Sequence, residues 1–352
     1  MGTRQGAVVT WDHVNGKPVA DTAAIPDVAC DESGSDGENL TGGNTDVFAH
    51  ASVRTPVETA AAHLREIRER IRSPAEEYKA NHLLREKHRA VLEWLLSPDG
   101  PLYGRAHVHL VEKAYFVVDR AVDLLLDDPA AAVLLFRDGR GTFRETDWRE
   151  FLEAANQLLR VRTHDVSDAP VEDFFRTVDR LRRTYAGTDA AGILDRIAPT
   201  RPRALAYRAD VQHGPFVLTP VLNPLLPSVL STAAHWSAGG RPVLLTHDRQ
   251  NMLTPDRIAW IEATARRRGI ALAGLRLVQA RFDARVQLAD FLAGIARKIA
   301  SDELNGRGDP ALTALLRPYT GERAVWGDER SWARLGPADE SGGPRTAVNS
   351  AV

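Results

Sequence analysis

Residues 27–34 read DVACDESG, an apolar stretch that runs into two adjacent carboxylates and a small turn. Residues 27–32 fit a strand with apolar side chains on both faces. Because side chains alternate between the faces of a strand, Asp31 and Glu32 are predicted to point to opposite sides. Asp31 then faces a cleft, and Gly34 lets the backbone turn closely past it. The alternative interpretation is a strand end capped by a polar turn.

The stretch that starts at Asp31 superficially resembles a calcium-binding loop, but its spacing excludes one. Such a loop needs oxygen ligands at its first, third and fifth positions, Gly at the sixth and Glu at the twelfth. Counting from Asp31, Asp36 occupies the sixth position and Gly42 the twelfth. The carboxylates therefore need another explanation.

The rest of the chain predicts an α/β fold with a mixed sheet flanked by helices. Further strands are expected at 46–54, 106–112, 242–247 and 271–279. Early strands, then helices, then a strand–helix–strand–helix order are typical of such a sheet.

The predicted organisation is a single α/β domain over residues 27–334. A helical insertion or cap is expected at about 120–238. Residues 1–26 are interpreted as a loose extension with one short strand at 7–9. Residues 335–352 are predicted to be a disordered tail.

Composition limits the classes of function. The formal net charge of the 352-residue chain is -2, so a polyanion such as nucleic acid would have to meet a local basic patch, for example at 180–183 or 266–268. The single cysteine, Cys30, excludes a disulfide framework and a Cys-rich zinc site. No apolar run approaches about 18 residues, which predicts no membrane span and a cytoplasmic protein. The sequence does not predict an oligomeric state.

Two further acids stand at positions where a site would assemble. Asp290 lies in VQLADFLAG (286–294), beside small residues that leave room for a hydrated cation. The alternative is an acid near a helix N-terminus, favoured by the helix dipole. Asp248 ends LLTHD (244–248), just past an apolar strand, and carboxyl ends of strands are where α/β sites form. The neighbouring His247 is interpreted as a ligand, a proton shuttle or an exposed loop residue.

A weaker candidate is EEYK at 76–79, which contains Glu77 and Lys79. Taken alone, it is typical of the solvated surface of a helix. Its interest lies in its order along the chain relative to the other acids.

These motifs together resemble the bacterial domain-of-unknown-function 3800 family, which is placed with the ribonuclease-H-like folds. The resemblance rests on DESG at 31–34, the Glu-x-Lys at 77–79, the acid after the late strand, and QLADFLAG at 287–294. It covers roughly residues 27–302. The late strand ends in THDRQN rather than a cleaner acidic pair, and the segment at 120–238 carries no matching motif.

The resemblance implies a ribonuclease-H-like sheet whose acids gather around one or two Mg²⁺ or Mn²⁺ ions. Asp31 is then the central ligand, Asp290 a second and Asp248 a third. Glu77 is implied to be an outer ligand or a water-orienting group. Lys79 is implied to contact phosphate or to balance the acidic cluster.

We therefore expect a metal-dependent nuclease or nuclease-like phosphodiesterase. The alternative is a non-catalytic nucleic-acid- or protein-binding regulatory module on the same fold. A serine or cysteine hydrolase is disfavoured, because the sequence has no G-x-S-x-G elbow and Cys30 lies within a predicted strand.

Overall fold

The computed structural model describes residues 25–72, 80–161, 168–210 and 219–337. The predicted strand at 7–9 lies outside these residues, as does most of the predicted extension and tail. None of the helices in these ranges is long and apolar enough to cross a membrane.

Five strands form one mixed sheet, which confirms the predicted α/β architecture. They are β1 (Asp27–Ser33), β2 (Val47–Val53), β3 (Ala106–Glu112), β4 (Val243–Asp248) and β5 (Leu272–Val278). Their order across the sheet is β3-β2-β1-β4-β5. The central strand β1 is antiparallel to β2 and parallel to β4, and β4 is parallel to β5. The carboxyl ends of β1, β4 and β5 therefore lie at the same edge.

The helices complete the fold around this sheet. They are α1 (Val57–Ile71), α2 (Ala80–Leu83), α3 (Arg89–Leu96), α4 (Lys113–Leu126), α5 (Pro129–Thr142), α6 (Glu145–Leu159), α7 (Ala169–Thr184), α8 (Asp189–Ile197), α9 (Arg201–Asp210), α10 (Leu225–Trp236), α11 (Pro255–Arg267), α12 (Ala284–Leu304), α13 (Pro310–Leu316) and α14 (Glu329–Leu335). Short 3₁₀ turns include η4 (Ala280–Phe282) between β5 and α12.

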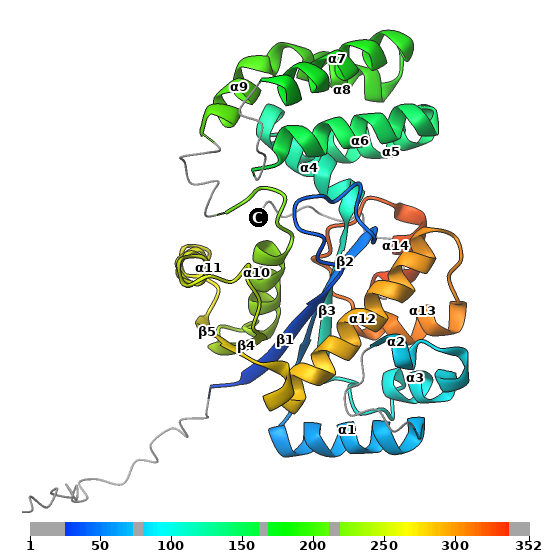
Figure 1. Cartoon of the computed structure of the whole chain (residues 1–352), viewed down its shortest axis with the longest axis vertical. Coiled ribbons are helices and arrows are strands. Elements are labelled where there is room, and N and C mark those ends of the chain that lie inside the picture. The colour runs from blue at the N-terminus through cyan, green and yellow to red at the C-terminus, as the bar shows by residue number, and fades with distance from the viewer. Residues whose placement is uncertain (1–24, 73–79, 162–167, 211–218, 338–352) are drawn as a thin grey trace, which may run out of the picture.

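Helix α12 is the main cover of one face of the sheet and packs along β1 and β2, while α10 packs on the other face (Figure 1). The spacing of Leu288, Leu292, Ile295 and Ile299 in the sequence predicts an apolar helix stripe, and all four residues of α12 are buried. A strip of small residues next to it is buried as well, so the helix approaches the sheet closely: Ala289, Ala293, Ala296 and Ala300. Residues of α12 therefore meet the side chains of β1 that face it.

Helices α5 to α9 form a separate helical layer that stands on α4, away from the sheet (Figure 1). Its core contains contacting aromatic rings, such as Trp148 and Phe151 with centroids 5.6 Å apart. Asn156 of this layer holds the loop after β1, accepting from the Leu40 N–H (3.0 Å) and donating to the Glu38 carbonyl (3.0 Å). Helix α10, at the end of the segment predicted as an insertion, packs on the sheet itself.

A polar network holds the start of α12 against the sheet. Arg285 is almost fully buried and donates to Asp27 Oδ2 (2.9 Å) and to Asp283 Oδ2 (2.6 Å). Asp27 also accepts from Thr246 Oγ1 (2.6 Å) and Arg276 Nη2 (2.7 Å). Charged groups removed from water need such partners, so this network determines where α12 begins over β1 and β4.

We expect Asp27→Asn to lower the free energy of unfolding by about 2 kcal/mol, because it weakens charged hydrogen bonds to Arg285 and Arg276. Urea unfolding measures the change. Glu66→Gln, which removes the partner of the exposed Arg70, is the control and should cost less than about 1 kcal/mol. Equal losses in the two variants would show that the network does not hold α12.

Candidate functional site

Asp31 lies near the carboxyl end of the central strand and points toward α12, as alternation along β1 predicts. Its side chain is buried, with 8% of the residue exposed, and its Oδ1 accepts the N–H of Glu32 (2.8 Å). Asp290 of α12 and Asp248 at the end of β4 both act electrostatically on it. The structure thus brings the three predicted metal-ligating acids into one region.

The environment of Asp31 strongly disfavours its charged form. Burial is the largest cause, followed by the negative charges of Glu32 and Asp290 and then that of Asp248, and together they raise the pKa of Asp31 to about 9. Without a counter-ion, its carboxyl group is therefore protonated at neutral pH. A buried acid surrounded by other acids is the arrangement that a cation would relieve.

Asp248 also holds the turn that leads into α12. Its Oδ1 accepts the N–H of Ala280 at 2.8 Å, and Gln287 Nε2 donates to the carbonyl of Ala280 at 2.9 Å. The η4 turn is therefore tied both to the acidic site and to α12.

Two glycines allow the backbone to pass close to this region. Gly34 has a φ of +91°, and a Cβ atom there would lie 2.4 Å from the carbonyl oxygen of Val47. This conformation confirms the tight turn predicted after Asp31. Gly294, one helical turn beyond Asp290, packs against Ala80 of α2, where an added Cβ would lie 2.3 Å from the Ala80 Cβ.

Glu77 and Lys79 lie outside the described residues. Their roles as an outer ligand and a phosphate contact therefore stay predictions. The first described residue after them, Ala80, contacts Gly294 on the same helix that carries Asp290.

Arg297 is a site residue that the sequence did not single out. It lies two helical turns after Asp290 on α12 and donates from Nε to Ser33 Oγ at 3.0 Å. Ser33 lies two residues after Asp31 on the same face of β1, so this half-buried cation lies at the carboxyl end of the strand that carries Asp31. The spacing of seven residues from Asp290 is the signal that would have found it.

Glu32 lies on the opposite face of the sheet from Asp31, yet it remains connected to it. Its Oε2 lies 3.5 Å from Nε2 of the fully buried His247, whose Nδ1 donates to the Asp248 carbonyl (2.9 Å). Burial raises the pKa of Glu32, whereas His247 and a side-chain hydrogen bond with Asp31 lower it. The interpretation of His247 as an exposed loop residue is wrong, because it is an interior residue of β4.

Buried histidines continue this polar row across the sheet, away from the acids. His50 of β2 pairs in register with Glu32 and with His109 of β3. Its ring stacks on His247 with centroids 5.2 Å apart, and Nδ1 lies 2.8 Å from Thr232 Oγ1 on α10. Burial lowers the pKa of His109 to about 4 and holds that of His50 well below its ordinary value. The rings of His50 and His109 are therefore neutral at pH 7 and form part of the packing beneath α10.

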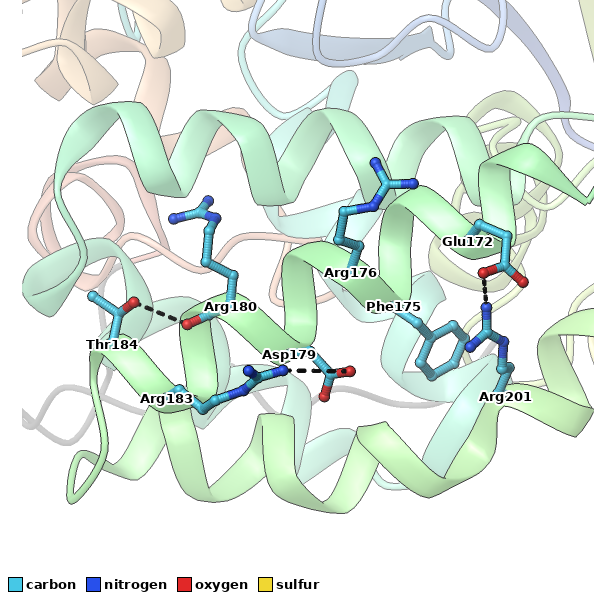
Figure 2. Close-up of a pocket in the computed structure, with 8 residues that line it drawn as sticks. All are labelled: Glu172, Phe175, Arg176, Asp179, Arg180, Arg183, Thr184 and Arg201. Carbon is cyan, nitrogen blue, oxygen red and sulfur yellow. Dashed lines mark hydrogen bonds and ion pairs between the residues drawn. The ribbon is translucent and has the colours of Figure 1, made fainter.

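The basic cluster at 180–183 lines a groove of about 620 Å³ between α7 and α9 (Figure 2). Each arginine that lines it is paired with an acid: Arg176 with Asp173, Arg180 with Asp147 and Glu150, Arg183 with Asp179, and Arg201 with Glu172. The groove lies in the helical layer rather than at the acids. Its charges are largely neutralised within the chain, which makes it a weak phosphate site.

The donor chemistry of the acidic region fits a hard cation, since its side-chain ligands are carboxylate oxygens. In the part of the chain that the structure describes, no three His, Cys, Asp or Glu side chains are arranged to hold a metal ion. Asp31, Asp290 and the free oxygen of Asp248 would have to approach one another to enclose one.

Comparisons of the chain with protein-family models, with curated proteins and with solved structures each found no match. Any functional conclusion therefore depends on the site.

We expect His109→Gln to reduce the acid sensitivity of the fold. The folded-state pKa of His109 is about 4 and the ordinary value is 6.5, so the unfolded chain binds an extra proton between these pH values. The histidine therefore costs about 1.4 kcal/mol of stability per pH unit as the pH falls from 6.5 to 4.

Chemical denaturation at several pH values measures the free energy of unfolding of wild type and variant. The difference between the two gives the contribution of His109. The comparison is needed because Asp31 and Glu112, whose pKa values are raised to about 9 and about 7, change the wild-type curve in the opposite direction. An identical pH dependence in the two proteins would contradict the prediction.

Proposed function

We propose that the protein is a metal-dependent phosphodiesterase of the nuclease type. The observation that carries the proposal is the buried carboxyl of Asp31, with Asp290, Asp248 and Glu32 acting on it electrostatically. Such a group favours either a proton or a divalent cation. Half-buried Arg297 and Ser33 beside it add groups suited to a phosphate oxygen.

As part of this proposal, we assign the chain to the domain-of-unknown-function 3800 family, which it resembles, and to its ribonuclease-H-like fold. The mixed sheet with acids at the carboxyl ends of β1 and β4 is compatible with that fold. A similar fold does not establish an activity, so the acids themselves have to be tested.

In the proposed mechanism, Asp31 and Asp290 hold Mg²⁺ or Mn²⁺ together with Asp248. The bound cation would supply an activated water and would stabilise the leaving oxygen of a phosphodiester. Binding requires Asp31 to release its proton. Arg297 then orients the phosphate from the Ser33 side, and the Asp248–Ala280 hydrogen bond keeps η4 at the rim.

A second candidate is a non-catalytic binding module with the same acids. It is favoured by the absence of a ready three-ligand metal group among the residues that the structure describes. Such a module would bind a nucleic acid or a protein without needing a cation.

We expect the affinity for Mn²⁺ to rise with pH between about 6 and 9, by up to tenfold per pH unit, because binding displaces the Asp31 proton. Isothermal titration calorimetry in buffers of different ionisation enthalpy measures the affinity and the protons released. Asp31→Asn should abolish binding, and Asp302→Asn, on α12 near Lys298, should not. Affinity that does not change with pH would rule out Asp31 as a ligand.

We also expect wild type with Mn²⁺ or Mg²⁺ to cleave at least one of a single-stranded, a duplex or a hybrid substrate. Asp31→Asn should lower the rate by at least about 100-fold, since loss of a group that only orients a metal ligand already costs about 10- to 100-fold. Gel assays of labelled strands measure the rate. If wild type cuts none of the three, or if Asp31→Asn cuts equally well, the phosphodiesterase proposal fails and the binding module is favoured.

A further inference from the structure

Phe282 is the most exposed large apolar side chain in the described ranges, with 74% of the residue accessible. A single exposed apolar residue is common on protein surfaces and needs no function. Phe282 differs from such residues in its position next to Asp248, in the fixed backbone turn that carries it, and in the arginines close to that turn.

The turn that carries Phe282 is fixed beside the acidic site. The N–H of Ala280, two residues earlier, is bound by the carboxylate of Asp248 at 2.8 Å. Within the turn, the N–H of Phe282 donates to Gln279 (2.9 Å) and that of Asp283 donates to Ala280 (3.1 Å). Gln287 of α12 holds the same turn through the Ala280 carbonyl. The backbone that carries the ring is therefore held in place relative to Asp248 and α12.

Two exposed arginines, one in the η4 turn and one directly after Asp248, form no ion pair among the described residues. Arg281 places its guanidinium 4.6 Å from the centre of the Phe282 ring and is exposed. Arg249 directly follows Asp248, is exposed, and is held at its backbone by an N–H bond to the Val278 carbonyl (2.7 Å). The ion pairs of the described residues include neither arginine, in contrast to the paired arginines of the groove on α7.

We propose that Phe282 and Arg281 form a base-stacking platform that selects single-stranded nucleic acid for the acidic site. An exposed ring stacks on any base, and neighbouring arginines contact phosphates. In a duplex the base faces are covered by their neighbours, so the ring has no surface to meet. A single ring among charges is too small for a hydrophobic protein interface. The substrate class rests on the proposed function, whereas binding by the platform does not require cleavage.

The test compares wild type, Phe282→Ala and Phe282→Tyr as full-length proteins. Fluorescence anisotropy measures their affinities for a labelled single-stranded oligonucleotide and for a duplex of the same length, with Ca²⁺ present. Wild type should favour the single strand. Phe282→Ala should weaken binding of the single strand about tenfold or more, while Phe282→Tyr, which keeps the ring, should bind like wild type.

A second variant tests the charge next to the ring. Arg281→Gln should weaken binding of the single strand and reduce the slope of log affinity against log salt by about 0.7, the value for one lost phosphate contact. Phe282→Ala should leave that slope nearly unchanged, because a stacking contact releases no counterion. If η4 had only a structural role, both variants would change the affinity for the single strand and the salt slope alike.

The outcomes separate this inference from the proposed function. The platform is overturned if wild type binds no single strand, if it binds the duplex as tightly, or if Phe282→Ala binds like wild type. If the platform results appear but Mn²⁺ neither binds nor supports cleavage, the platform stands and the phosphodiesterase proposal fails. If Asp31-dependent cleavage is found while Phe282→Ala binds the single strand like wild type, the phosphodiesterase stands and the platform fails.

Discussion

The burial of one carboxyl group, that of Asp31, is the constraint on which the site depends. Removal from water and the nearby charges of Glu32, Asp290 and Asp248 raise the pKa of this acid to about 9, so it keeps its proton at neutral pH. The fold tolerates this arrangement because α12 is held over β1 by a network of its own, in which Arg285 bridges Asp27 and Asp283. The stability of the fold and the site therefore depend on the same two elements, β1 and α12. At the start of α12, Arg285 is paired with acids, whereas about one helical turn later Asp290 lies near the like-charged Asp31.

The two faces of the sheet handle polar groups in different ways. On the α12 face, the acids lie where β1 and β4 end, and Arg297 forms a hydrogen bond with Ser33 at the last residue of β1. On the α10 face, histidines of β2 and β3 are buried in neutral form. Glu32 links the faces, since it contacts His247 on one side and forms a hydrogen bond with Asp31 on the other. The charge of the acidic region is therefore coupled to the packing beneath α10 as well as to any bound cation.

The η4 turn next to the site is held by one of the acids, Asp248. Asp248 both acts on Asp31 and binds the η4 turn, so the turn cannot shift without disturbing the acids. This turn carries the exposed Phe282 and Arg281, while the basic groove on α7 lies elsewhere and is neutralised by its own acids. Proximity to the acids, rather than the number of arginines, distinguishes the surface that we propose for a nucleic-acid strand.

Local pattern was enough to predict the five strands, the alternation that separates Asp31 from Glu32, the turn at Gly34 and the apolar stripe of α12, because each depends on neighbours in the chain. The electrostatic action of Asp248 and Asp290 on Asp31 was expected only through the order of motifs, and no spacing could have shown it. The histidine row, the Arg297–Ser33 contact and the hold of Asp248 on η4 were not predicted. They join residues that lie tens to hundreds of positions apart, and strand order and the path of α12 decide which of them meet.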